Sequence, residues 1–287
     1  MIRSFALILA LVLALASPAR AQPPIWIVRD ADSEILLFGS VHVLPPGIDW
    51  GQARLDPWLK TADDLWFELP VDAATEAETG RIAAARGVLP AGASLRSMLS
   101  APARARMARL APAYGISLEQ LDRLEPWFAE VVLAGQAYRK AAASVGAGVE
   151  QTISRRAPPR LARRAFETPD LQIALFDEAP LAVQIASLED TLKEMERDTK
   201  AYEGLVAAWQ KPDLKGLERE AIAPMRKVSP VLYQRLLADR NAAWTRTLDQ
   251  RLKGKGRTVV VVGIGHLIGK DGVPARLRGL GYSVEGP

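Results

Sequence analysis

Apolar runs typical of β-strands lie near both ends of the chain. Residues 25–28 and 34–38 are short apolar runs separated by a polar turn, which predicts a β-hairpin. Residues 65–69 form another such run, and Pro70 ends it. Four consecutive valines in 258–263 are too continuous for a half-exposed strand. They predict a central strand that is buried on both faces.

Between residues 72 and 253 the pattern changes to that of helices. Alanine and arginine dominate there, and helix start and stop signals are frequent. Ser117 and Gln120 have the spacing of a capping box, and Pro126 fits the first turn of a helix that follows. Residues 180–210 predict one long helix or two consecutive helices. Shorter helical patterns cover residues 50–62 and 270–281, and a short strand-like run follows the second of these.

The arrangement of these patterns predicts an α/β protein, with α+β as the alternative class. We expect one domain over residues 22–287, in which 22–70 and 254–287 together build a central mixed sheet. Residues 71–253 would then be a large helical insertion into this α/β core. The length is sufficient for one large domain or for one domain with such an insertion.

The first 21 residues have the composition of an export signal. Arg3 supplies a positive charge, Phe5–Ala16 an apolar segment, and Ala19–Ala21 a cleavage pattern of small residues. We expect cleavage after Ala21 and a periplasmic or secreted protein. The segment is short for a membrane span, so contact with a membrane is expected only if the signal remains uncleaved as an anchor.

Composition and charge exclude several classes of protein. The chain has no cysteine, which excludes disulfides, a lipidated cysteine and a catalytic or metal-binding thiolate. Loss of Arg3 and Arg20 with the signal leaves 35 basic against 33 acidic residues, a net charge of +2. This balance gives no case for a nucleic-acid partner. The sequence does not indicate an oligomeric state.

The two histidines of the chain both follow an apolar run with the spacing Gly-x-x-His. Gly39 precedes His42, and Gly263 precedes His266. Each glycine suits a positive φ angle or a close backbone approach. Because the carboxyl ends of neighbouring parallel strands meet at one edge of a sheet, we expect the two imidazoles to lie together. Either one alone could be a structural histidine in the core, but the repetition favours a functional site.

Glu68 is the third candidate, because it interrupts an apolar run near a strand end. A buried carboxylate without a partner is costly. Two imidazoles and a carboxylate suit a three-ligand site for a divalent transition metal such as Mn, Co or Zn. They equally suit a metal-free set that deprotonates water or a hydroxyl group. The alternative for Glu68 is a solvent-facing position on the strand face shared with Trp66 and Pro70.

Three further charged residues are candidates for supporting roles. Arg240 falls in a gap of an apolar stripe that advances by fours, made of Leu232, Leu236, Trp244, Leu248 and Leu252. It either snorkels to the surface or holds a buried anion such as Glu68 or a substrate carboxylate. Glu150 and Glu167 are candidates for carboxylates behind the site, or for ordinary acids near a helix N-terminus.

Several segments, in order along the chain, resemble the TraB/PrgY/GumN family in its bacterial GumN-like branch. They are FGSVHVLP, ADDLWFELP, LEPWF, GVEQTI, FETPDLQIALFD, DRNAAW and VVVVGIGHLIGKDGVPARLRGLGYSVE. That family is similar to the Tiki proteases, which are membrane-associated metal-dependent peptidases, and more distantly to erythromycin esterase-like and ChaN-like proteins. The resemblance implies an α/β core with two Gly-x-x-His motifs and an acidic residue. It places the motif residues on Gly39, His42, Glu68, Arg240, Asn241, Gly263 and His266. Glu150 stands where the family usually has aspartate.

The resemblance indicates a site more closely than it indicates a reaction. Some relatives cleave peptides with a metal, some hydrolyse a lactone without one, and some bind haem. We expect an exported, metal-dependent hydrolase that acts on a peptide or another small acyl substrate. His42 and His266 would bind the metal, Glu68 would be a third ligand or the base, and Arg240 would complete the catalytic set. The alternatives are a non-enzymatic periplasmic protein that binds a peptide, haem or a metal ion, and a protein whose helical middle carries the function.

Overall fold

The computed structural model describes residues 21–197, 200–211 and 213–287. The expected export signal, apart from Ala21, lies outside these residues. One six-stranded mixed sheet has the strand order β4-β3-β5-β2-β1-β6. Its strands are β1 (Ile25–Arg29), β2 (Ser33–Ser40), β3 (Asp64–Phe67), β4 (Ala162–Ala165), β5 (Gly256–Gly263) and β6 (Ser283–Glu285). The predicted α/β class, with a central mixed sheet built mainly from the two ends of the chain, is confirmed.

The N-terminal strands form the predicted hairpin. β1 pairs antiparallel with β2, so that Ile25 lies opposite Phe38. The polar turn between them is closed by the Asp30 carboxylate, which accepts a hydrogen bond of 2.8 Å from the Ser33 N–H. β6 adds to the outer side of β1, also antiparallel. The last strand of the chain therefore lies beside the first.

β5 is the central strand that the valine run predicts. It lies between β2 and β3 and is parallel to both. The four valines of 259–262 are 0–1% exposed. Helices cover both faces of a strand in this position. Side chains on both faces are therefore buried, and the sequence is continuously apolar and does not alternate with polar residues.

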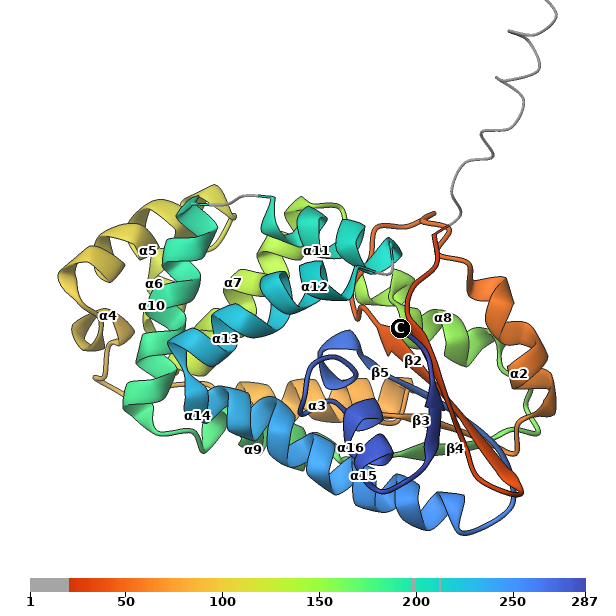
Figure 1. Ribbon diagram of the computed structural model, residues 1–287. Coiled ribbons are helices and arrows are strands. Elements are labelled where there is room, and N and C mark those ends of the chain that lie inside the picture. The colour runs from red at the N-terminus through yellow and green to blue at the C-terminus, as the bar shows by residue number, and fades with distance from the viewer. Residues whose placement is uncertain (1–20, 198–199, 212) are drawn as a thin grey trace, which may run out of the picture.

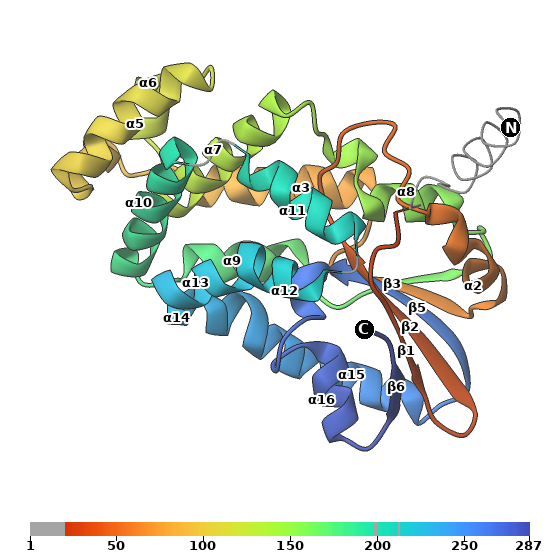
Figure 2. The same cartoon turned by 45° about the horizontal axis from the view of Figure 1, so that its top comes forward.

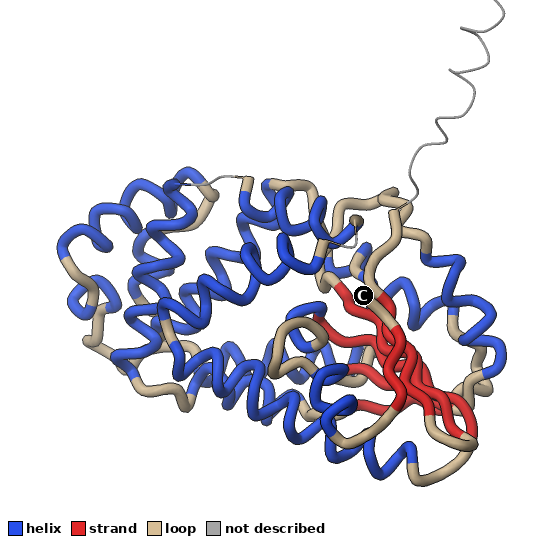
Figure 3. The backbone as a smooth tube through the Cα atoms, viewed as in Figure 1, coloured by secondary structure: helices blue, strands red, loops and turns tan. Residues whose placement is uncertain are grey.

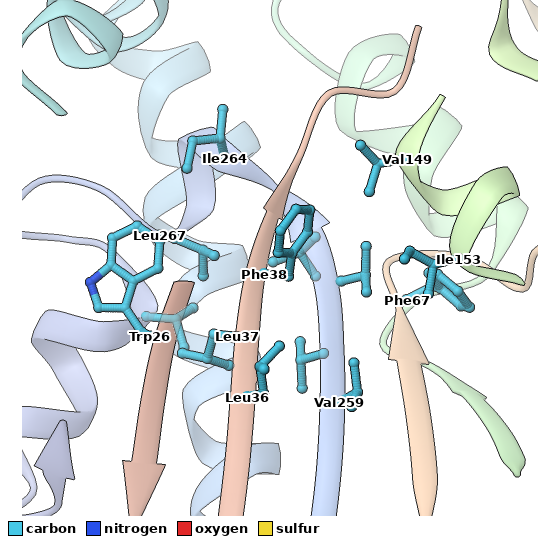
Figure 4. Close-up of a cluster of buried hydrophobic side chains, with 14 of the residues drawn as sticks. Trp26, Leu36, Leu37, Phe38, Phe67, Val149, Ile153, Val259, Ile264 and Leu267 are labelled. Carbon is cyan, nitrogen blue, oxygen red and sulfur yellow. The ribbon is translucent and has the colours of Figure 1, made fainter. Parts of the chain in front are cut away.

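Two layers of helices cover the sheet (Figures 1 and 2). One layer is formed by α2 (Asp56–Thr61) and α8 (Val149–Arg156), and the other by α15 (Asp239–Leu252) and α16 (Val273–Gly279). Figure 4 shows Phe38 and Phe67 on the side of Val149 and Ile153, which belong to α8. These four side chains are at most 2% exposed, so the main core lies between the sheet and α8 as well as beneath α15.

The rest of the chain between β3 and β5 is mostly helical, and these helices extend to the left of the sheet in Figure 3. Short 3-10 turns are η1 (Gln52–Leu55), η2 (Val145–Ala147) and η5 (Ile264–His266). The remaining helices are α3 (Ala73–Arg86), α4 (Leu95–Met98), α5 (Ala101–Ala113), α6 (Leu118–Asp122), α7 (Pro126–Lys140), α9 (Pro169–Asp177), α10 (Leu181–Arg197), α11 (Ala201–Gln210), α12 (Leu214–Leu217), α13 (Ala223–Val228) and α14 (Pro230–Tyr233). A second apolar core joins α5, α7 and α10 through Met107, Leu133 and Leu188, all fully buried.

Helix boundaries follow their local signals. The Ser117 hydroxyl accepts a hydrogen bond from the Gln120 N–H at the start of α6, and Pro126 is the first residue of α7. The stretch 180–210 forms two helices, α10 and α11. Among the described residues no single helix has the length and apolar composition of a membrane span, although α9 and α10 together meet that composition across a bend of 86°.

The segment 71–253 also contributes a strand, which the sequence did not predict. β4 pairs with the outer side of β3 and extends the parallel part of the sheet. Its residues, Ala-Arg-Arg-Ala, are exposed apart from the last, so they carry no hydrophobic pattern. Charged side chains are typical of an edge strand, where they discourage pairing with another chain. β4 directs the segment that begins at Phe166 to the edge of the sheet where β3 ends.

Candidate active site

Four parallel strands end at the same edge of the sheet, and a polar residue follows each of them. His42 follows β2, His266 follows β5, Glu68 follows β3 and Glu167 follows β4. The strand registers bring these ends level, because Gly263 at the end of β5 pairs with the last residue of β2. The carboxyl edge of a parallel sheet is where α/β proteins gather binding and catalytic groups.

The two imidazoles meet at one oxygen atom of Glu68. The Nε2 atoms of His42 and His266 lie 3.9 and 3.8 Å from Glu68 Oε1. The structure therefore brings together the three residues that the repeated motif and the interrupted apolar run single out. The arrangement depends on β5 lying between the strands that carry the other two residues.

His42 is accessible to solvent and is held from behind by a carboxylate. Its Nδ1 lies 2.6 Å from Glu150 Oε1, and the Ser40 hydroxyl donates to the same oxygen. The side chain is 59% exposed. The negative charge of Glu150, followed by that of Glu68, raises the pKa of His42 to about 9. Near neutral pH this imidazole is protonated and both ring nitrogens are donors.

Glu150 reaches His42 because Gly148 packs directly against the loop after β2. A Cβ atom at Gly148 would overlap the carbonyl group of His42. The φ angle of Gly148 is −60°, which any residue adopts, so the close approach is what requires glycine here. The N–H of Val149 donates a hydrogen bond of 3.2 Å to the carbonyl of Val41, which fixes the start of α8 against this loop.

His266 has the opposite surroundings. Its Nδ1 lies 2.6 Å from Asn241 Oδ1, while the Asn241 amide nitrogen donates to the carbonyl of Asp271 over 2.9 Å. This second bond orients the amide, so we assign the ring proton to Nδ1 and leave Nε2 unprotonated, as an acceptor. The side chain is 5% exposed and packs on Trp244 with ring centres 4.3 Å apart. Burial lowers the pKa of His266 to about 3, so the ring is neutral.

Glu68 is buried and ionised. Its Oε1 accepts a hydrogen bond of 2.8 Å from the Gly263 N–H, and its Oε2 accepts one of 2.6 Å from Arg240. Burial opposes ionisation, but the two imidazoles, the guanidinium and the backbone donor hold the pKa of this carboxyl below its usual range. The alternative of a solvent-facing Glu68 is wrong, since the side chain is 9% exposed.

Arg240 holds two carboxylates in place. Its Nε and Nη2 atoms donate to Glu167 over 2.7 and 2.9 Å, and Nη2 also donates to Glu68. Its Nη1 donates to the carbonyl of Leu236 over 2.9 Å and lies 3.0 Å from Nε2 of His266. The side chain is 11% exposed and lies over the Trp244 ring. Of the two roles left open for Arg240, holding a buried anion is therefore the one observed.

Glu167 completes the network beneath the site. It accepts a hydrogen bond of 3.0 Å from the indole of Trp244 in addition to those from Arg240. Its own N–H donates to the carbonyl of Glu68, which couples the loops after β3 and β4. Both glutamates that the sequence left undecided, Glu150 and Glu167, thus lie directly behind the three central residues.

Sequence reasoning did not identify two of these partners. Ser40 lies between the glycine and the histidine of the first motif, so its place in the motif could have indicated it. Trp244 belongs to an apolar stripe in the sequence, which gives no signal for the direction of its indole N–H. A π-helical turn, η4 (Gln234–Ala238), comes directly before α15. Such turns are frequent near functional sites, and this one includes Leu236, which binds the guanidinium of Arg240.

The motif glycines allow close approach and have no unusual backbone angle. Neither Gly39 nor Gly263 has a positive φ. A Cβ atom at Gly39 would overlap the side chain of Ile264. A Cβ atom at Gly263 would lie 3.2 Å from both Glu68 Oε1 and His42 Nε2. Of the two roles proposed for these glycines, the structure has the close approach.

The donor set suits a divalent metal ion, although the atoms stand further apart than bound ligands do. Ligands at the usual bond lengths lie roughly 3.3–3.6 Å from one another in a tetrahedral site. The two nitrogen–oxygen separations at Glu68 exceed this. In the described part of the chain no group of three or more His, Asp or Glu side chains forms an assembled metal site. Both histidines nevertheless present Nε2 while an outer acceptor holds Nδ1, which is the usual support for a metal-binding histidine.

The fold and the site together define an α/β protein whose parallel strands deliver two Gly-x-x-His motifs and a glutamate to one sheet edge. The chain belongs to the TraB/PrgY/gumN family, whose sequence model matches residues 24–286. It is similar to the uncharacterized protein YbaP of Escherichia coli (strain K12), with 25% identity over 260 residues that cover 89% of this chain and 92% of the relative. The uncharacterized protein YbaP of Shigella flexneri matches with the same identity and coverage. No solved structure matches the chain.

Proposed function

We propose that this protein is an exported hydrolase that cleaves a peptide bond or another acyl bond with the help of a divalent metal ion. The observation that carries the proposal is the convergence of three donor atoms: the Nε2 atoms of His42 and His266 and the Oε1 atom of Glu68. Of these residues, His42 is exposed to solvent. Export would place it in the periplasm or outside the cell. Its partner would be a peptide or small-molecule substrate.

His42, His266 and Glu68 would hold the metal ion, which is Mn, Co or Zn on the chemistry of these donors. When bound, the metal would supply a Lewis acid that polarises the substrate carbonyl and lowers the pKa of a water molecule. Glu150 and Asn241 keep the two rings turned so that each Nε2 faces the shared point. These outer contacts fix ring orientation before any substrate arrives.

Glu68 would serve as the third ligand or as the base that accepts the proton of the attacking water. Either role needs an ionised carboxylate, which Arg240 and the Gly263 N–H favour. Arg240 is itself oriented by Glu167. To free the lone pair of His266, the Nη1 group of Arg240 would have to move away from Nε2, since the two lie 3.0 Å apart.

That same contact favours a second candidate, a hydrolase that uses no metal. Here Arg240 would stay on His266 and keep its ring neutral and fixed. Glu68 would accept the proton of water, and protonated His42 would donate a proton to the leaving group. The opposite protonation states of Glu68 and His42 suit a base and an acid that act in one reaction.

The test uses protein that begins at Gln22, stripped with a chelator and reloaded with Mn, Co or Zn. Cleavage of a peptide library is followed by mass spectrometry for the wild type, His42→Ala and Glu68→Gln, with exposed Glu119→Gln as the matched control. Cleavage that requires metal and is lost in both site variants supports the first proposal. Cleavage by the stripped protein supports the metal-free candidate.

Two results would contradict both candidates. One is stoichiometric binding of a peptide, haem or metal ion without turnover, which is the behaviour of a non-enzymatic binding protein. The other is full activity of His42→Ala and Glu68→Gln, which would move the function to another part of the chain.

A further inference from the structure

A large cavity is lined by helices of the segment 71–253, which Figure 1 draws to the left of the sheet. It has a volume of about 890 Å³ and is enclosed mainly by α7, α10, α11 and α13. Its walls are largely apolar and include Trp127, Val131, Tyr138, Phe176 and Met225. A volume of this size and lining is typical of a site for a small molecule or a short peptide segment.

The cavity adjoins the candidate active site through two of its lining residues. The hydroxyl of Tyr202 donates a hydrogen bond of 2.8 Å to the carbonyl of Val43, the residue after His42. Leu236, also in the lining, accepts from the guanidinium of Arg240. A ligand that fills the cavity therefore lies next to the segments that carry His42 and Arg240.

One carboxyl group stands in this largely apolar cavity without a basic partner. Oε1 of Glu130 accepts hydrogen bonds from Ser187 and Thr191, over 3.0 and 2.7 Å. Among the described residues no donor contacts its Oε2 and no cation pairs with it. Burial and the nearby charge of Asp190 raise the pKa of Glu130, and the two hydroxyl hydrogen bonds only partly oppose this. Nothing in the chemistry proposed above uses this residue.

The charged residues around the cavity are mostly acidic. Five carboxylates line it, against two lysines, and two of the five, Glu194 and Glu220, pair with Arg197 and Arg219 outside the lining. An apolar lining with a small excess of negative charge favours a ligand that combines an apolar body with a cationic group. The partly buried carboxyl of Glu130, which has no cation beside it among the described residues, is the position where such a group would gain most.

We propose that this cavity binds the apolar, cationic part of the substrate, with an amino or guanidinium group of the ligand donating to Glu130. The inference rests on the proposed function in one respect, that the ligand is the substrate. It narrows the substrate class to apolar peptides that carry a lysine or arginine side chain or a free amino terminus near the cleaved bond.

The cavity is tested first by binding alone. Isothermal calorimetry of the full mature chain, free of metal, compares n-octylammonium, n-octanoate and n-octanol, which share one chain and differ in head group. We expect octylammonium to bind at least about tenfold more tightly than octanoate. Glu130→Gln should remove this preference and leave octanol binding unchanged, while Glu119→Gln, outside the cavity, should keep the preference. Ala137→Trp, which fills the cavity, should abolish binding of all three, whereas Ala137→Ser should not.

Equal binding of octylammonium and octanoate would overturn the inference, as would a preference that survives in Glu130→Gln. The same titration on His42→Ala distinguishes the cavity inference from the proposed function, because binding of the probe needs no turnover. We expect octylammonium to bind this variant as it binds the wild type. If metal-dependent cleavage is found but octylammonium does not bind, the cavity inference fails and the hydrolase stands. If the probe binds as expected and no peptide is cleaved, the cavity stands as a cationic ligand site and the hydrolase fails.

A second arm distinguishes a peptide from a simple amine as the natural ligand. Apolar peptides with and without one lysine are compared as substrates. We expect Glu130→Gln to raise KM about tenfold for the lysine peptide with little change in kcat, and to leave the neutral peptide unaffected. An equal effect on both peptides would contradict recognition of the cation by Glu130.

Discussion

The two histidines are alike in sequence context and opposite in electrostatic surroundings. His42 is open to solvent and bonded to a carboxylate, whereas His266 is buried and bonded to the neutral amide of Asn241. One ring therefore carries a proton near neutral pH and the other does not. Because only His42 is protonated, both rings can lie beside Glu68 without repulsion between two positive charges.

The first prediction is that the two rings titrate on opposite sides of the ordinary histidine value. In metal-free protein, NMR should give a midpoint near 9 for His42, while His266 stays neutral down to about pH 3. The His42→Ala spectrum assigns both signals. The His42 contribution to folding stability is present below about pH 6.5 and is lost as pH rises through 9, whereas neutral His266 costs stability as pH falls below about 6.5. Midpoints for both rings near 6.5 would contradict this electrostatic picture.

The second prediction concerns the carboxylate behind His42. Glu150→Gln should lower the pKa of His42 towards its ordinary value, because the charge of Glu150 is the main cause of the shift. Above about pH 9, where no proton competes for the ring, loss of an outer-shell partner of this kind should reduce metal affinity about 10–100-fold. Glu150→Asp keeps the charge and is the matched control. An unchanged His42 titration in Glu150→Gln would show that the ring is held by other groups.

At this scale the sequence predicts the central residues and not their surroundings. The repeated motif and the interrupted apolar run indicate His42, His266 and Glu68, because these signals are local. Ser40 and Trp244 are recognisable only once strands and helices are placed, since hydrogen-bond direction depends on tertiary structure. The roles of Arg240 and Glu167 are also defined only by the tertiary structure, because the two side chains orient each other through their hydrogen bonds.

At the scale of elements, the site is built from the residues that follow the carboxyl ends of β2, β3, β4 and β5. The hairpin and the central strand were predictable because burial leaves a hydrophobic pattern in β1, β2 and β5. β4 was not, since an exposed edge strand of alanine and arginine has no such pattern. The π-helical turn η4 is likewise invisible in sequence, although it lies directly before the helix that carries Arg240.

The third prediction is that a change at the end of β5 remote from the site lowers the stability of the protein without changing its activity. At the end of β5 far from the site, the buried Thr258 hydroxyl donates to Asp64 over 2.6 Å. Thr258→Val removes this donor from a buried carboxylate and should lower the free energy of unfolding by about 1–3 kcal/mol, measured by urea denaturation. Exposed Thr247→Val is the control and should change it by less than about 0.5 kcal/mol. Activity per folded molecule should be equal in both variants, and a selective loss in Thr258→Val would contradict the separation of the two strand ends.

At the scale of the whole molecule, the sheet and the helical segment have separate apolar cores, and the large cavity lies among the helices next to the site. The helical middle is thus not a passive insertion, because it supplies Glu150, Glu167 and Arg240 to the sheet edge. It also forms every wall of the cavity.

The fourth prediction links metal binding to protons and to stability. A metal ion at Nε2 of His42 displaces the proton that this ring holds near neutral pH. The apparent affinity should therefore rise about tenfold per pH unit up to about pH 9 and then level off. Thermal unfolding with and without Mn, Co or Zn measures this as a pH-dependent rise in Tm. His42→Ala should show no such pH dependence, and a shift that is equal at all pH values would exclude His42 as a ligand.

The fifth prediction concerns export. A chain cleaved after Ala21 begins at Gln22, whose nitrogen donates to the carbonyl of Gln210 over 2.8 Å. A new amino terminus can make the same contact, so cleavage need not disturb the fold. Intact-mass measurement of the protein from a periplasmic or culture fraction should give the mass of residues 22–287. Full-length protein found only in the membrane fraction would instead indicate an uncleaved anchor.

The position of β5 has a consequence for how the molecule is made. In the common doubly wound strand order 3-2-1-4-5-6, the last strand lies at the edge of the sheet. Here a chain interrupted before residue 256 lacks the middle of the sheet, and β2 and β3 have no neighbour that joins them. His42 and Glu68 then have no common edge, even though both were synthesised early. The candidate site therefore cannot assemble before β5, near the end of the chain, has been synthesised and has paired with both β2 and β3.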